Sequence, residues 1–184
     1  MTTSKNQLQR FAMYFGTYMG AYWGLKFIAF PLSFTVPFMS MAYFVLTLAV
    51  PFLGYYYTKS YRNKACGGYL SFGNAVLFVL LMYMFASLLA AVVHFVYFEF
   101  IDQGYVLDQY TLSIHNLMET PGVAFDREVI ENMLQDLGRL SSTEITMQIL
   151  SVDMTAGAFL SIPTALFVAR RNPEGEGADQ QPIN

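Results

Sequence analysis

The chain has 184 residues, a formal net charge of −3 and a composition that is 55% hydrophobic but only 12% charged. Soluble domains carry about 25% charged residues, so this chain lacks the polar residues needed to cover a soluble domain. The small negative charge and the lack of a basic patch argue against nucleic-acid binding. The length allows one domain. We expect it to cover residues 1–172, followed by a disordered cytoplasmic tail over 173–184.

Four apolar stretches are long enough to cross a membrane, because a spanning helix needs roughly 20 predominantly apolar residues. They cover residues 11–30, 36–57, 70–98 and 149–169. The sequence therefore predicts an all-α polytopic membrane protein with a four-transmembrane-helix bundle. The basic leader before the first stretch is also typical of signal peptides. That stretch exceeds the usual length of about 7–15 residues, is interrupted by Lys26 and has no cleavage site after it, so we expect it to remain as a span.

Basic residues predict the orientation of the spans. Lys5 and Arg10 precede the first stretch, Lys59, Arg62 and Lys64 lie between the second and third, and Arg170 and Arg171 follow the last. The long segment 102–145 is instead rich in acidic residues. Short loops rich in lysine and arginine stay in the cytoplasm. We therefore expect both termini in the cytoplasm and residues 102–145 on the outer, periplasmic side.

The outer segment has helical periodicity of its own. Apolar residues recur at helical spacing over 105–118 and again over 126–140, with a break at 121–122. Ser141 followed by Glu144 is a capping-box pattern, which starts the last helix just outside the membrane. Amphipathic helices of this kind lie on the bilayer, cover the bundle or bind an outer partner, and the pattern leaves these alternatives open.

Small residues recur at intervals of four in two of the spans. The set comprises Gly16, Gly20 and Gly24 in the first span and Gly157, Ser161 and Ala165 in the last. Such rows allow two helix backbones to approach closely. Packing inside the bundle and packing between subunits both fit this pattern.

Three ionisable residues fall within or near the outer half of the spans. At a rise of about 1.5 Å per residue, Lys26 and Asp153 lie at similar depth, and His94 lies close to the outer interface. A charge at the centre of a membrane helix costs about 2.5–3.5 kcal/mol by insertion scales. Lys26 either extends to the outer headgroups or pairs with Asp153, with His94 nearby, in a polar pocket.

Motifs for catalysis are missing from the sequence. It has no Walker loop, no zinc-protease motif, no nucleophile elbow and no dinucleotide fingerprint. His94, Glu99 and Asp102 are the nearest approach to a catalytic cluster, and the single cysteine, Cys66, has no metal-ligand spacing. We therefore expect no catalytic, cofactor-binding or metal-binding residue.

A short motif between the second and third stretches carries a family resemblance. It reads Tyr61-Arg62-Asn63-Lys64, then Gly67-Gly68-Tyr69-Leu70-Ser71-Phe72-Gly73-Asn74-Ala75. It resembles the signature of an uncharacterised bacterial family, the domain of unknown function numbered forty-one ninety-nine, and the outline extends over residues 10–172. The resemblance implies a four-span inner-membrane protein of Gram-negative bacteria. It implies no activity and no functional residues.

Three classes of function remain open. The first is a non-catalytic accessory or scaffold subunit, with the bilayer and a membrane protein or a second copy of the chain as partners. The alternative is a small solute or ion transporter or channel, with a polar site in the outer leaflet. The weakest is an enzyme for lipid-linked substrates, which would depend on His94, Glu99 and Asp102.

Overall fold

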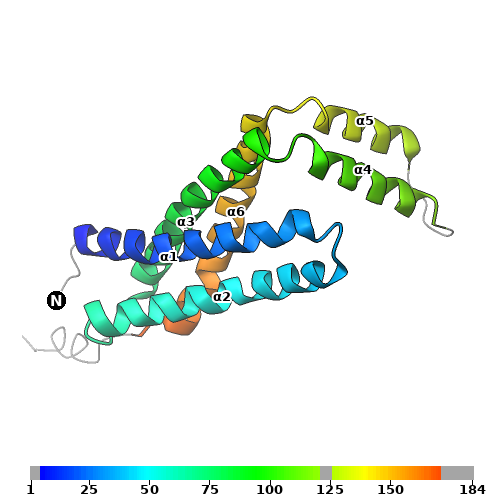
Figure 1. The fold of residues 1–184 in the computed structure, drawn as a ribbon. Helices are drawn as coiled ribbons and strands as arrows, with labels where there is room; N and C mark the ends of the chain where they lie inside the picture. The colour runs from blue at the N-terminus through cyan, green and yellow to red at the C-terminus, as the bar shows by residue number, and fades with distance from the viewer. Residues whose placement is uncertain (1–4, 121–125, 171–184) are drawn as a thin grey trace, which may run out of the picture.

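The computed structural model describes residues 5–120 and 126–170, which form six helices. These are α1 (Lys5–Leu32), α2 (Pro37–Ala65), α3 (Phe72–Phe100), α4 (Tyr105–Met118), α5 (Arg127–Leu137) and α6 (Ser142–Val168), as Figure 1 shows. The all-α fold is therefore as predicted. The expected break at 121–122, Arg171 and the expected tail over 173–184 lie outside the described residues.

Within the described ranges, three helices are long and apolar enough to cross a membrane: α2, α3 and α6. The predicted set of four spans is not confirmed, because α1 is not among them. Although α1 has 28 residues, its glycines, tyrosines and Lys26 dilute its apolar character. The helix α2 continues beyond the predicted span, through Lys59, Arg62 and Lys64 to Ala65, so these basic residues are helical.

The helices are arranged around α3. Figure 1 shows α1 and α2 side by side, crossing α3 and α6, which form a second adjacent pair. The most extensive packing in the described structure joins α3 to α6 on one side and to α1 on the other. The helices α4 and α5, which we call the arm, project beyond the end of α3 (Figure 1). The core therefore lies where the two pairs cross.

Two glycines bring the backbones of α1 and α3 together. A Cβ on Gly16 would lie 2.8 Å from the Phe85 Cβ and 2.9 Å from the Met82 carbonyl oxygen. A Cβ on Gly20 would lie 2.9 Å from the Leu89 Cβ. Because each of these contacts is too short for a real side chain, both positions require glycine. Removing the side chain is what permits such a close approach of membrane helices.

The row of small residues on α6 begins with a second close contact to α3. A Cβ on Gly157 would lie 2.6 Å from the Cβ of Tyr83, and both Ser161 and Ala165 are buried. Gly24, at the end of the α1 row, has more space, since its Cβ would lie 3.3 Å from a Val93 methyl group. Both rows therefore contact α3 within this chain.

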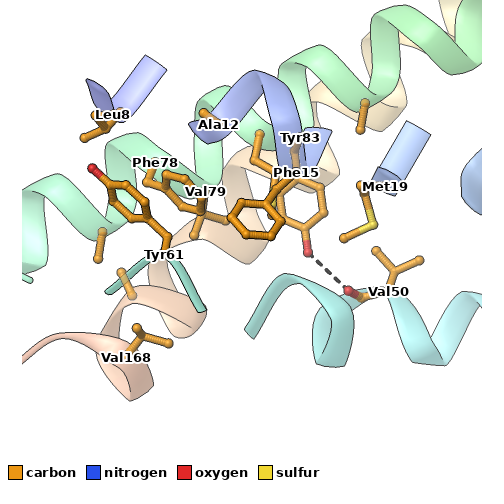
Figure 2. Packing of buried hydrophobic residues seen from close by; sticks show 14 of the residues in the cluster. Leu8, Ala12, Phe15, Met19, Val50, Tyr61, Phe78, Val79, Tyr83 and Val168 are labelled. Atoms are coloured by element: carbon orange, nitrogen blue, oxygen red, sulfur yellow. Dashed lines mark hydrogen bonds between the residues drawn. The ribbon is translucent and has the colours of Figure 1, made fainter. Parts of the chain in front are cut away.

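Aromatic residues fill the core between the crossing pairs (Figure 2). Tyr61 of α2 is fully buried and stacks on Phe78 of α3, with ring centroids 4.2 Å apart and an angle of 1° between the planes. The Tyr83 hydroxyl donates a hydrogen bond of 3.3 Å to the Val50 carbonyl oxygen, drawn as a dashed line in Figure 2. Val50 precedes Pro51 inside α2, and Tyr83 thereby joins α3 to α2.

Local signals at the arm and at α6 match the observed helix starts. Asp126 caps α5 by accepting hydrogen bonds from the backbone of the next turn, as α5 begins at Arg127. Ser141 and Glu144 form the predicted capping box, with Ser141 N donating to Glu144 Oε2 at 2.8 Å and Glu144 N donating to Ser141 Oγ at 3.3 Å. Hydrogen bonds from Ser141 lower the pKa of the exposed Glu144 carboxyl. The last helix therefore begins before the predicted span at 149.

Replacing Gly20 with leucine should lower thermal stability, because the backbones of α1 and α3 leave no space for the side chain. Overpacking a close contact costs about 1–3 kcal/mol. Gly73→Leu is the matched control, since nothing lies within 4 Å of a Cβ at Gly73. Thermal unfolding of both variants in one detergent checks the prediction. Equal transition temperatures would contradict it.

Candidate functional site

The first candidate site is the turn formed by the family signature. Gly67 and Gly68 have φ angles of +62° and +90°, which glycine adopts without steric cost. The amides of Cys66 and Gly68 both donate to the Arg62 carbonyl oxygen, at 3.2 Å and 3.0 Å. The two glycines therefore end α2 and reverse the chain toward α3.

This turn is fastened to the end of α6. Leu70 N donates to the Arg170 carbonyl oxygen at 3.1 Å, and Arg170 N donates back to the Leu70 carbonyl oxygen at 2.9 Å. The Arg62 side chain is only 5% exposed, and its Nη1 donates to the Val168 carbonyl oxygen at 2.9 Å. The last carbonyl groups of a helix have no hydrogen-bond donors within that helix. Arg62 supplies a donor to one of them, the carbonyl of Val168. We call Arg62, Leu70, Val168 and Arg170 the signature clamp.

The remaining signature residues have smaller structural roles. Ser71 is the N-cap of α3 without a hydrogen bond from its side chain. Tyr69 and Phe72 are exposed, and the space around a Cβ at Gly73 is open. The sequence indicated the motif but not the buried Arg62, because its partner at Val168 is 106 positions away.

The second candidate site is a cavity of about 160 Å³ lined by residues of four helices. Its polar walls are Trp23 and Lys26 of α1, Tyr43 of α2, His94 of α3 and Asp153 of α6. The structure thus places all three residues of the sequence-predicted pocket, Lys26, His94 and Asp153, around one space. Trp23 and Tyr43 were not expected there, since aromatic residues are common in every membrane helix. We call this space the polar cavity.

Lys26 and Asp153 line the polar cavity without touching each other. Among the described residues, the one ion pair with a nitrogen–oxygen distance within 4.0 Å is the exposed pair Arg139–Asp136, at 3.5 Å. The Lys26 amine and the Asp153 carboxylate therefore lie more than 4.0 Å apart. Lys26 Nζ lies 5.3 Å from the centre of the Tyr43 ring and 5.9 Å from that of Trp23. These are cation–π distances. The lysine amine lies over two aromatic rings, and the Asp153 carboxylate lines the same cavity beyond ion-pairing distance.

Two buried nitrogens at the polar cavity lack hydrogen-bond partners. They are Nε1 of Trp23 and Nδ1 of His94, whose residues are 6% and 5% exposed. The His94 ring packs against Phe27, with centroids 4.2 Å apart. Each nitrogen has less than 1 Å² of accessible surface, so neighbouring side chains cover it and it does not open into the cavity. A buried polar group without a partner costs about 1–3 kcal/mol.

The hypothetical catalytic cluster is not assembled. Asp102 accepts hydrogen bonds from the amides of Gly104 at 3.2 Å and Val106 at 3.1 Å, so it helps to start α4. Glu99 is exposed, whereas His94 is buried in the polar cavity. In the described part of the chain, no three histidine, cysteine or acidic residues are grouped as metal ligands.

These features define an all-helical protein of the membrane-associated class, with three apolar helices in the described residues and a polar cavity among them. Residues 14–170 match the DUF4199 family, described as proteins of unknown function, and the chain belongs to that family. The match confirms the resemblance carried by the signature. Searches of curated proteins and of solved structures found no match.

Replacing Arg62 with leucine should destabilise the chain, because the Val168 carbonyl loses its buried donor. Hydrogen bonds to charged groups contribute about 1.5–3 kcal/mol. Lys64→Leu is the control, since Lys64 lies two residues further along α2 and is exposed. The free energy of unfolding in detergent should fall for Arg62→Leu and stay near the wild-type value for Lys64→Leu. Equal stability of the two variants would contradict a role for the signature clamp.

Proposed function

We propose that α1, α2, α3 and α6 all cross a bacterial inner membrane, with both termini in the cytoplasm. The length of α1 supports a fourth span, since 28 residues extend about 42 Å and the hydrocarbon core is about 30 Å thick. The least apolar residues of α1 do not need to face lipid. Gly16 and Gly20 lie against α3, and Lys26 lines the polar cavity.

The ends of the helices support this orientation. Lys5 and Arg10 lie on the first turns of α1, and Arg62 and Lys64 on the last turn of α2. The turn over 33–36 at the other end carries no charge. Basic residues favour the cytoplasmic side. We therefore propose that the arm lies in the periplasm.

We further propose that the protein is a non-catalytic accessory or scaffold subunit of a membrane assembly. The carrying observation is the arm, which projects from the crossing helices (Figure 1) and exposes large apolar side chains. These are Tyr110, Leu112, Leu117, Val129 and Met133, of which Met133 is 40% and Val129 60% exposed. Exposed apolar clusters outside the hydrocarbon are typical of interaction surfaces.

A hollow at the base of the arm gives this surface a shape. It has a volume of about 490 Å³ and lies between α5 and the first turns of α6. Its apolar walls are Val129, Met133, Leu137 and Leu140, with Gln148 on α6. Apolar anchors set in a polar rim are the usual basis of protein recognition. A membrane-protein partner or a second copy of the chain is the proposed occupant.

The alternative function is a small solute or ion transporter, and the polar cavity favours it. Ionisable groups inside membrane helices usually mark a site for a solute or an ion. Reconstitution separates the two functions. A chain that moves solute into liposomes by itself is a transporter, whereas an accessory subunit needs its partner.

The proposed topology predicts which introduced cysteines are accessible from outside. In a Cys66→Ser background, which removes the only native thiol, Asn116→Cys on α4 should react with an impermeant thiol reagent in intact spheroplasts. Asn63→Cys on α2 should react only after permeabilisation. Both native asparagines are exposed, so access to the reagent depends on the side of the membrane. Labelling of Asn63→Cys alone in intact spheroplasts would overturn the topology.

The accessory role predicts that an added charge in the hollow releases a partner. Met133→Asp should reduce the amount of co-purifying protein per chain at least tenfold after extraction in a mild detergent. Gln135→Asp is the control, because Gln135 is exposed on α5 and does not line the hollow. Equal recovery with both variants would exclude the arm as the docking surface. A monomer that moves solute without a partner would favour the transporter.

A further inference from the structure

We propose that the polar cavity binds a small zwitterionic solute, with an amine and a carboxylate a few bonds apart, as in glycine or alanine. This inference goes beyond the accessory role and does not depend on it. It requires only that the site is reached from the outer side. The argument rests on the charges and the size of the cavity.

The charges of the polar cavity call for a ligand with two opposite charges. Lys26 and Asp153 line the same space but lie beyond ion-pairing distance. Neither side chain makes a hydrogen bond to another described residue. A simple anion at Lys26 would be repelled by Asp153, and a simple cation at Asp153 would be repelled by Lys26. A zwitterion in the correct orientation satisfies both residues at once.

The charged side chains define the orientation of the ligand. Lys26, which lies over the Trp23 ring at 5.9 Å, forms the subsite for a carboxylate. Asp153 forms the subsite for an ammonium group on the α6 side of the same cavity.

The apolar walls limit the size of the ligand. The volume of about 160 Å³ holds a few waters or a compact solute of a few heavy atoms. Phe27 and Phe30 stack with centroids 6.0 Å apart, and Phe30 contacts Tyr43 at 5.7 Å. Ile149 closes the side formed by α6. A compact amino acid such as glycine or alanine fits a cavity of this volume.

The protein contains its own reporter for binding. Trp23 is the single tryptophan of the chain, and its indole lines the cavity. Adding glycine or alanine to the full-length protein in detergent should change tryptophan emission in a saturable manner. Methylamine and acetate, which carry one charge each, should bind at least tenfold more weakly. A response to acetate as strong as that to glycine, or no saturable response to either amino acid, would overturn the proposal. The second result would mean that the cavity holds water only.

Charge-removing variants test the two subsites separately. Lys26→Gln and Asp153→Asn should each weaken binding of radiolabelled glycine at least tenfold and abolish the rise in melting temperature that the ligand gives the wild type. Lys59→Gln is the matched control, because Lys59 lies 5.5 Å over the Tyr55 ring in a similar cation–π contact but outside the cavity. Wild-type affinity in both cavity variants would refute the site. The fluorescence titration of the unmodified protein decides the question if either variant fails to fold.

Discussion

The fold depends on the close approach of α1 to α3. Lipid tails compete with apolar side chains, so helices associate in a bilayer through close packing and hydrogen bonds instead of the hydrophobic effect. Gly16 and Gly20 supply the packing, because their missing side chains let two backbones meet. This contact fixes α2 as well, which follows α1 after a short turn and receives a 2.6 Å hydrogen bond from the Tyr22 hydroxyl at the Leu46 carbonyl oxygen.

The polar residues of the spans occur where several helices meet. The hydroxyl of Tyr83 reaches α2 at Val50, while its Cβ lies against Gly157 of α6. Toward the C-terminal end of α1, Lys26 lines the polar cavity together with Asp153 of α6. Such groups are costly in contact with lipid, and the crossing of the two helix pairs provides the enclosed space that they need. Close packing of α1 on α3 therefore also creates the walls of the polar cavity.

Much of the fold follows from local sequence, and the exceptions have physical causes. The Ser141–Glu144 capping box and the α4 helix over 105–118 were predictable because they depend on neighbouring residues. It was not predictable that α1 would fall outside the set of apolar spans. The glycines that allow α1 to pack on α3 also lower its apolar character. Charges in apolar stretches are conspicuous, which is why Lys26 and Asp153 could be selected for the cavity. The contact of Arg62 with Val168 joins distant segments and leaves no local signal.

The signature clamp has a consequence for the order in which the chain is assembled. A ribosome releases α1, α2 and α3 before α6, so the contact between α1 and α3 can form while the last helix is still being made. Arg62 must wait for the Val168 carbonyl, 106 positions later. Until then its guanidinium has no backbone acceptor on α6, and burial of an unpaired charge is strongly unfavourable. The clamp therefore closes last, and in a chain that ends before α6 the Arg62 guanidinium stays hydrated at the end of α2 instead of binding the Val168 carbonyl oxygen.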